Sequence, residues 1–525
     1  MNLSVVRVAL RRAIDARGGL GAWRCCLAFV LVTAAAGSGV ARGAVAPATD
    51  VVTVAATPAL APIPADYLGV SLEYNTVSAY EGTPPTGVNP VLAQLIRNLA
   101  PGGVPVIRIG GDSTDWTWWP VVGMKRPPGV NNDLTEAWAA KAQALARSAG
   151  ARLILGLNLE AGSAVVARME AQQLLAAVGQ GLIEAFEVGN EPQLYPLLPW
   201  YRLPDGTLQV GRPLSYNLSD YAKEFAGVAN TLPHVPLAGP AVGHSWVDQI
   251  APFISSAPGL RIVTFHAYAI NKYGAAFRGR NCSTAVSDPS HPTVSTLLAP
   301  FASEGLTRDL PQLVALAHRR GLRFRIDELN AITCAGTPGV SDSFASALWA
   351  LNALFAIANA GIDGVNIHTW RASAGKLFGF SRTGGEWSAS VRPEYYGLLM
   401  FKRAAPAGSR LLATSQTVKA AVDSWATIGA DHATRVLLIN YSLTNSKSVR
   451  VQLPRPTAAR ATLTWLRAPS ATATSGVTLG CQSFAAQTLT GELAGPACVD
   501  SVRPVSGSYS VQLPPATAVL VTIPN

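Results

Sequence analysis

Two short apolar stretches of the sequence each lead to a glutamate. Residues 183–188 are followed by Gly189, Asn190 and Glu191, and residues 322–327 are followed by Glu328. Both stretches are typical of buried β-strands. A carboxylate at the end of such a strand carries a desolvation cost that core packing alone would not favour. The two glutamates are therefore the first candidates for chemistry.

A pair of carboxyl groups at one mouth of a barrel is what glycoside hydrolysis requires. We predict Glu191 as the general acid/base and Glu328 as the nucleophile. A separation of about 5–5.5 Å between them would give retention through a covalent glycosyl-enzyme. Like charges at this distance raise one pKa, so one carboxyl is protonated while the other is ionised. The alternative is that both are ordinary strand-end carboxylates paired with Arg108 or Arg325.

Further polar and aromatic side chains follow the other predicted strands. Sugar hydroxyls need bidentate hydrogen-bond acceptors, and the apolar faces of sugars stack on aromatic rings. The predicted substrate-binding residues are Glu73, Asp112, Asn190, Tyr268, His368 and Trp370. Asn190 is expected to bind the 2-hydroxyl of the sugar. The alternatives are a pocket-wall role for Tyr268, a core role for His368, and a loop-bracing role for Glu73 or Asp112.

Arg108 lies inside a run of aliphatic residues in the second predicted strand. A buried arginine needs an anionic partner. We predict that this partner is Glu328, whose ionised form the guanidinium would stabilise. The alternative is a salt bridge elsewhere in the barrel.

The elements that must position these residues alternate between strands and helices, which is typical of a parallel α/β architecture. Eight strands, the number that a closed barrel requires, are predicted at Leu68–Tyr74, Val104–Gly110, Arg152–Leu159, Ile183–Val188, Pro236–Ala241, Arg261–His266, Arg323–Glu328 and Gly364–His368. Helices are predicted after the Asn89-Pro90 cap and over Glu136–Ala149, Asp309–Arg320 and Asp342–Ala360.

From about residue 405, short β-rich runs replace the helical patterns. They are predicted at Val418–Val422, Ala433–Tyr441, Ser448–Leu453, Ala461–Leu466 and Tyr509–Ile523. We therefore predict an α/β fold with a (β/α)8 TIM barrel over residues 65–402 and a C-terminal all-β sandwich over residues 403–525. The lone strand-like run within residues 44–64 is expected to join this sandwich.

The first 43 residues have the features of a signal peptide. Five arginines precede an apolar run from Cys25 to Ala36, and small residues follow it. An uncleaved anchor is the alternative. We expect a secreted or periplasmic protein with no membrane attachment after signal removal. Residues 1–43 hold six arginines and one aspartate, so the remaining 35 basic and 30 acidic residues leave a net charge of only +5. This small surplus does not indicate a nucleic-acid partner.

Four cysteines remain after residue 43. An even number in an exported chain predicts two disulfides, and the shortest pairing is Cys282–Cys334 with Cys481–Cys498. The spacing of these cysteines does not resemble a zinc site, so no metal is expected.

Several motifs together resemble glycoside hydrolase family 79 within clan A, the group of β-glucuronidases and heparanase-like enzymes. They are Leu68-Gly69-Val70-Ser71-Leu72-Glu73, Arg108-Ile109-Gly110-Gly111-Asp112, Glu187-Val188-Gly189-Asn190-Glu191-Pro192, Asp327-Glu328-Leu329-Asn330 and residues 339–349. The resemblance implies a retaining mechanism with no cofactor and an oligo- or polysaccharide substrate. It also implies that Tyr268 supports the nucleophile and that His368 contacts the sugar.

One departure from the family pattern concerns the substrate. Family members that hold a uronate often carry Tyr-Gly-Gly five residues after the nucleophile, and Thr333-Cys334-Ala335 stands there in this chain. A uronate carboxylate would then be met by Lys272, Arg371, Lys376 or backbone amides. The first prediction is an exo-acting β-glucuronidase. The alternatives are a β-glucosidase-like or endo-acting heparanase-like hydrolase, and a non-catalytic carbohydrate-binding protein.

Overall fold

The structure is a computed structural model that describes residues 50–58, 60–81, 88–272, 291–418 and 422–525. The predicted signal peptide and Cys282 lie outside these residues, so the signal peptide and the Cys282–Cys334 pairing stay predictions. Within the described part of the chain, no helix combines the length and the apolar character needed to cross a membrane.

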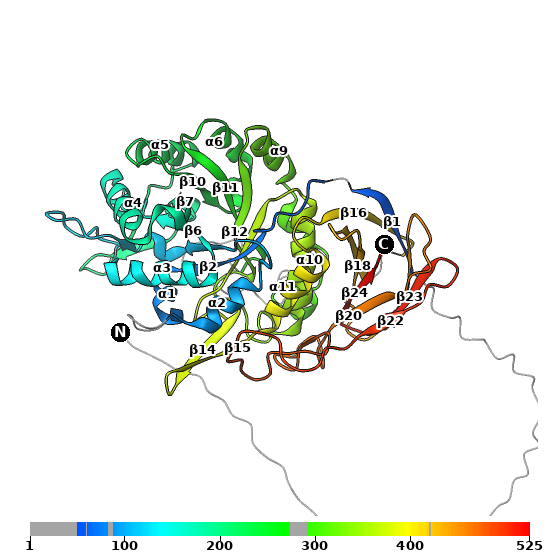
Figure 1. Ribbon diagram of the computed structural model, residues 1–525. Coiled ribbons are helices and arrows are strands. Elements are labelled where there is room, and N and C mark those ends of the chain that lie inside the picture. The colour runs from blue at the N-terminus through cyan, green and yellow to red at the C-terminus, as the bar shows by residue number, and fades with distance from the viewer. Residues whose placement is uncertain (1–49, 59, 82–87, 273–290, 419–421) are drawn as a thin grey trace, which may run out of the picture. The chain divides into compact units, whose positions relative to one another are not determined.

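Eight parallel strands form a closed barrel, in the order β10-β11-β12-β13-β2-β3-β6-β7 (Figure 1). They are β2 (Leu68–Glu73), β3 (Val106–Gly110), β6 (Arg152–Leu157), β7 (Ile183–Val188), β10 (Leu237–Val242), β11 (Leu260–Ile270), β12 (Arg323–Ile332) and β13 (Gly364–His368). All eight predicted strands are present, which confirms the predicted barrel. Their aliphatic residues are almost completely buried because helices cover the outside of the sheet.

The helices are α1 (Tyr74–Glu81), α2 (Pro90–Arg97), α3 (Glu136–Ala149), α4 (Ala164–Val178), α5 (Leu218–Ala229), α6 (Ile250–Ser256), α7 (Val294–Leu297), α8 (Phe301–Glu304), α9 (Pro311–Arg319), α10 (Phe344–Asn359) and α11 (Pro393–Ala404). The Asn89 side chain accepts hydrogen bonds from the first backbone amides of α2, as its cap position predicts. Helix α3 ends at Gly150, whose φ of 63° closes the helix in the left-handed region.

A mixed ten-stranded sheet follows the barrel. Its strands are β1 (Asp50–Pro58), β16 (Arg410–Gln416), β17 (Val422–Ile428), β18 (Thr434–Asn440), β19 (Lys447–Gln452), β20 (Ala461–Arg467), β21 (Thr478–Leu479), β22 (Asp500–Val502), β23 (Ser508–Leu513) and β24 (Thr517–Ile523). The N-terminal strand β1 lies between β16 and β19, antiparallel to the first and parallel to the second. Segments from the two ends of the chain therefore share one sheet and one apolar core.

The structure differs from the predicted strands at two places in this sheet. The run predicted as one strand over Tyr509–Ile523 is two strands, because Pro514 and Pro515 remove backbone donors between them. Most of the run predicted at Val418–Val422 lies outside the described residues, and β17 begins at its last residue, Val422. The strand β16, which the sequence analysis did not predict, lies before it.

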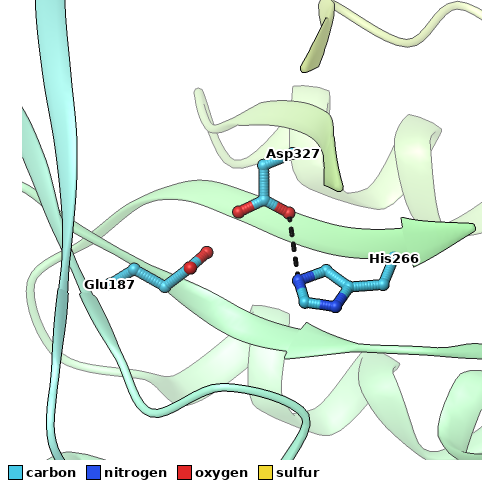
Figure 2. A group of neighbouring side chains, drawn as sticks. All are labelled: Glu187, His266 and Asp327. Atoms are coloured by element: carbon cyan, nitrogen blue, oxygen red, sulfur yellow. Dashed lines mark ion pairs between the residues drawn. The ribbon is translucent and has the colours of Figure 1, made fainter. Parts of the chain in front are cut away.

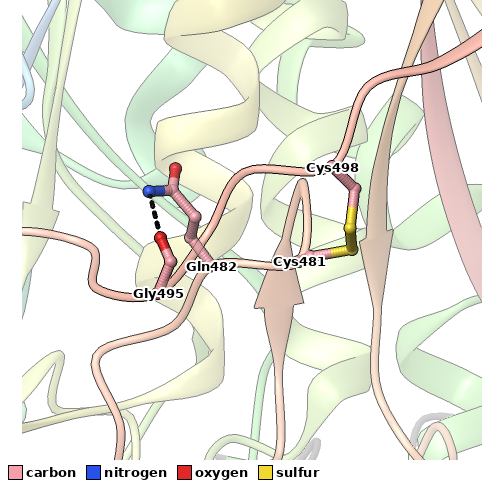
Figure 3. Close-up of a disulfide and its surroundings, with 4 residues drawn as sticks. All are labelled: Cys481, Gln482, Gly495 and Cys498. Atoms are coloured by element: carbon pink, nitrogen blue, oxygen red, sulfur yellow. Dashed lines mark hydrogen bonds between the residues drawn. A yellow bond between two sulfur atoms is a disulfide. The ribbon is translucent and has the colours of Figure 1, made fainter.

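The Cys481–Cys498 pairing is confirmed (Figure 3). Its Cα atoms lie 5.5 Å apart, and the Gln482 side chain donates to the Gly495 carbonyl beside it at 3.0 Å. Barrel and sheet are packed together through side chains of α10. Trp425 of β17 stacks on Phe355 at 5.6 Å and donates to Asn352 at 2.6 Å.

Candidate active site

The Glu328 carboxylate lies at the carboxyl end of the barrel and is held from two sides. Arg108 of β3 donates to its Oε2 at 2.6 Å, and the Tyr268 hydroxyl of β11 donates to its Oε1 at 2.6 Å. Burial alone would raise the pKa of Glu328. Electrostatic interactions with His368, His266 and Arg108 and the Tyr268 hydrogen bond instead hold that pKa well below its usual range. The lowered pKa favours the ionised form of Glu328 at neutral pH.

Glu191 follows β7 in a left-handed conformation, with φ of 45°. This conformation is strained for a residue with a side chain, and a hydrogen bond from the Glu191 amide to the Ala241 carbonyl at 3.0 Å fixes it. The Glu191 Oε1 lies 3.3 Å from Nδ1 of His266, and the same Nδ1 lies 3.9 Å from Glu328 Oε2. These two oxygens are thus no more than 7.2 Å apart, the sum of the two distances.

This limit is compatible with a retaining pair, whose carboxyl groups lie about 5–5.5 Å apart, and overlaps only the lower end of the range of about 6.5–9.5 Å for inverting pairs. The two carboxyl groups are therefore close enough to act on the same glycosidic bond. The two glutamates differ in exposure, since the Glu191 side chain is 21% exposed and that of Glu328 only 8%. The more accessible Glu191 is open to solvent, while Glu328 is enclosed by its hydrogen-bond donors.

Glu73, at the end of β2, faces His368, at the end of β13. The His368 Nε2 lies 3.5 Å from Glu73 Oε1, and its Nδ1 lies 3.8 Å from Glu328 Oε2. Burial opposes protonation of His368, but Glu328 and Glu73 raise its pKa overall. The Glu73 Oε2 also accepts from the Ser113 amide at 2.8 Å. Gly111 permits this approach, because a Cβ there would lie 2.3 Å from the Glu73 carboxylate.

The Asp112 residue is exposed and follows β3 at the mouth of the barrel. Desolvation by the surrounding protein, together with the charges of Glu73, Glu191 and Glu328, raises the pKa of Asp112 to about 8. The solvent in the open mouth moderates the desolvation part of this rise. Asp112 is consequently placed to donate a hydrogen bond to a hydroxyl at neutral pH.

Arg108 makes the contacts that the sequence predicts for it, and several more. Besides Glu328, its guanidinium donates to Asn190 Oδ1 at 2.8 Å and to Glu187 Oε2 at 2.8 Å. Because the Asn190 oxygen is used in this way, the amide nitrogen is the group left to meet a substrate. Arg325, the alternative partner, instead donates to Asn366 at 2.5 Å.

Under this layer lies a buried group formed by Glu187, His266 and Asp327 (Figure 2). In the described part of the chain, this group alone brings three atoms of metal-ligand type within 4.8 Å of one another. The Arg108 guanidinium lies 2.6 Å from Glu187 and 3.7 Å from Asp327. It already supplies the positive charge that a metal ion would bring, so we assign these carboxyl groups to Arg108.

The tryptophans near Asp112 divide between core and pocket. Trp118 is buried and donates to Asp133 at 2.7 Å. Trp116 lines a small pocket beside Glu191, together with Trp200 and Pro199 from the hairpin of β8 (Pro199–Arg202) and β9 (Leu208–Val210). Trp370 is half-buried and stays a predicted stacking residue.

Of two further acidic residues of the site, the sequence analysis missed Asp115 and left Glu160 as a surface or supporting carboxylate. Asp115 is buried and accepts four hydrogen bonds from the loops after β6 and β7. Glu160 lines the pocket beside Glu191, and burial with the Asp115 charge raises its pKa to about 9. Glu187 and Asp327 stood within the quoted motifs without a role, although a carboxylate inside a buried strand is itself a signal.

The comparison with protein families gives a match for the C-terminal sheet. Residues 424–520 match the family model described as "Glycosyl hydrolase family 79 C-terminal beta domain". This match confirms the predicted family resemblance from a part of the chain that carries no proposed catalytic residue. A comparison of the sequence with curated proteins gives no match.

Solved glycosidase structures have the same fold. A 4-O-α-L-rhamnosyl-β-D-glucuronidase from Fusarium oxysporum superposes with a TM-score of 0.70 at 17% identity, over 90% of this chain and 100% of that one. A family 51 arabinofuranosidase from Xanthomonas axonopodis pv. citri gives 0.62 at 16% identity, over 90% and 99%. An α-L-arabinofuranosidase from Thermotoga maritima gives 0.60 at 15%, over 91% and 100%. At these identities, the likeness establishes the fold.

Proposed function

We propose that the chain is a retaining exo-β-glucuronidase, a proposal supported by the match of residues 424–520 to the C-terminal β domain of glycosyl hydrolase family 79. The observation that carries this proposal is the meeting of Glu191 and Glu328 around His266, with Glu328 held ionised by Arg108 and Tyr268. A protein that only binds sugar has no need for such a pair.

In the first step, the Glu328 Oε attacks the anomeric carbon while Glu191 donates its proton to the glycosidic oxygen. The bond from the anomeric carbon to that oxygen breaks, and the leaving group departs as an alcohol. The transition state carries positive charge on the sugar ring, which the anionic carboxylate stabilises. Arg108 and Tyr268 keep the nucleophile ionised and oriented before the substrate arrives.

In the second step, Glu191 acts as a base. It removes a proton from water, whose oxygen attacks the anomeric carbon and displaces Glu328. The product retains its anomeric configuration because two inversions have occurred. Asn190, fixed through its oxygen by Arg108, is proposed to donate its amide N–H to the 2-hydroxyl.

The uronate preference is supported by a cation near the mouth. Lys272 follows Tyr268 by four residues, just beyond the end of β11, and its Nζ donates to the Gly336 carbonyl at 2.8 Å. Thr333 accepts from the Lys272 amide at 2.8 Å, so this loop holds the lysine although it lacks the usual tyrosine. The proposed partner of the uronate carboxylate is thus Lys272 together with backbone amides.

Exo action and export are further parts of the proposal. The β8–β9 hairpin borders the pocket beside Glu191, and this supports a site that is closed at one end. The Cys481–Cys498 bridge is typical of an oxidising compartment and supports secretion or periplasmic location, with residues 1–43 as the signal.

The test uses a panel of nitrophenyl β-glycosides with glucuronide, glucoside, galactoside and xyloside. The wild type is expected to prefer the glucuronide. Glu328→Ala should lose this activity, and azide should restore it with formation of an α-glycosyl azide. Glu191→Gln should retain much more activity on substrates with good leaving groups than on alkyl glycosides.

A matched control is Glu184→Gln, which changes a glutamate at the opposite end of β7 that pairs with Arg152. This variant should keep wild-type kinetics. Normal turnover by Glu328→Ala would remove the nucleophile from its role. Preference for the glucoside would leave the hydrolase mechanism standing and contradict the uronate specificity.

A further inference from the structure

Asp115 lies at the point where three loops of the barrel mouth meet. Its Oδ1 accepts from the amides of Leu159 and Glu160, at 2.8 and 3.0 Å. Its Oδ2 accepts from the Asn190 amide at 3.1 Å and from the Tyr195 hydroxyl at 2.8 Å. The residue is only 3% exposed, so the protein itself satisfies the carboxylate.

The backbone of Asp115 adds to these contacts. Its carbonyl accepts from Asn158 Nδ2 and from Trp200 Nε1, both at 3.0 Å. One residue therefore connects its own loop after β3, the loop after β6, the loop after β7 and the β8–β9 hairpin. Such a residue fixes several loops relative to one another.

The segment on which Asp115 acts most directly is the strained one that carries Glu191. Gly189 has φ of 76°, and a Cβ at that position would lie 2.6 Å from the Tyr195 hydroxyl. The left-handed Glu191 follows one residue after the Asn190 amide that Asp115 accepts. Strain of this kind persists only where surrounding contacts determine the conformation.

We propose that Asp115 is a positioning residue for the general acid/base: its carboxylate anchors the Asn190 amide and the Tyr195 hydroxyl and thereby aims Glu191 at the glycosidic oxygen. This inference rests on the proposed role of Glu191. Asp115 itself does not touch the substrate, because its acceptor oxygens are used by protein donors. Loss of the anchor should therefore reduce acid catalysis while leaving nucleophilic attack by Glu328 intact.

The test is Asp115→Asn, which keeps the shape but replaces one acceptor oxygen by a donor facing other N–H groups. We expect kcat/KM for alkyl β-glucuronides to fall at least about tenfold more than kcat/KM for a dinitrophenyl β-glucuronide, since general acid catalysis contributes about 10²–10⁴-fold. The dinitrophenyl substrate needs no proton on its leaving group. Azide should accelerate turnover of the dinitrophenyl substrate, as expected when the base is displaced.

Tyr195→Phe gives a second test in case the first variant does not fold. It removes one of the four donors to Asp115 and should shift the same leaving-group ratio in the same direction, by a smaller factor. Asp133→Asn is the control, because Asp133 binds Trp118 and Arg126 away from this network. It should leave the ratio unchanged.

Equal losses on both substrates, or an unchanged ratio in a folded Asp115→Asn, would overturn the positioning role while the proposed hydrolase activity stood. A wild type that cleaves no β-glycoside of the panel would instead overturn both proposals. The two failures are therefore distinguishable.

Discussion

The buried carboxyl groups of Glu187 and Asp327, next to Glu328, allow a prediction of which of them carries a proton. Glu187, Asp327 and Glu328 all face Arg108, at 2.6, 3.7 and 2.6 Å. Glu328 has His368 and Tyr268 as further partners, whereas Glu187 and Asp327 share the Arg108 guanidinium, and an uncompensated buried charge is costly. Burial and the neighbouring Glu187 raise the pKa of Asp327. Burial acts against ionisation of Glu187 as well, but the Arg108 charge lowers its pKa overall. Asp327 is thus expected to be protonated and Glu187 ionised.

Two isosteric substitutions distinguish these charge states. Glu187→Gln removes a real charge from a buried pair, which costs about 3–5 kcal/mol. Because Arg108 keeps its contact with Glu328, we expect a loss at the lower end of this range, about 3 kcal/mol. Asp327→Asn replaces a neutral carboxyl group by an amide of the same shape and should cost about 1 kcal/mol or less.

Thermal unfolding and steady-state kinetics measure both effects. The entropy of unfolding for a chain of this size is about 1 kcal/mol per kelvin, so we expect Tm to fall by about 3 °C for Glu187→Gln and by about 1 °C or less for Asp327→Asn. Activity on an aryl β-glucuronide should fall more in the first variant, because Arg108 shifts from its position on Glu328. Equal effects, or a larger effect of Asp327→Asn, would refute the assignment of the proton to Asp327.

Three further predictions concern other parts of the molecule. Tyr268→Phe removes the 2.6 Å hydrogen bond to the nucleophile, and we expect kcat/KM to fall by roughly 10- to 150-fold, the equivalent of about 1.5–3 kcal/mol, with little change in Tm. Asp112, with a pKa of about 8, is neutral below that pH, so KM for a glucuronide should rise as the pH passes upward through about 8, and this rise should be absent in Asp112→Asn. The double variant Cys481→Ser with Cys498→Ser opens a loop with a sequence separation of 17, so its free energy of unfolding should fall by about 3 kcal/mol while kcat stays unchanged. A flat KM profile across pH 7–9 would contradict the prediction for Asp112. A fall in kcat of the double cysteine variant would contradict the prediction for the disulfide.

The sequence predicted the barrel well because each of its strands is a short, nearly continuous apolar run between helix signals. Burial on both faces of a parallel sheet produces that pattern locally, so no tertiary information is needed to find it. The same local logic identified Glu191 and Glu328, since each follows such a run. Two predictions failed in the C-terminal sheet. The strand β16 was missed, and the break at Pro514 and Pro515 was overlooked although two consecutive prolines are themselves a local signal that ends a strand.

By itself, then, the sequence determined the fold class, the order of the barrel strands along the chain and the residue types at the barrel mouth, although β11 and β12 extend to Ile270 and Ile332, beyond their predicted ends. Only the tertiary structure decided which carboxyl group keeps its charge, because the pKa of each depends on neighbours from other strands. Arg108, Tyr268 and His368 come from three different strands to make Glu328 an anion. The role of Asp115 could not be predicted from the sequence either. Its four hydrogen-bond donors come from segments distant along the chain, and no local pattern marks such a loop residue.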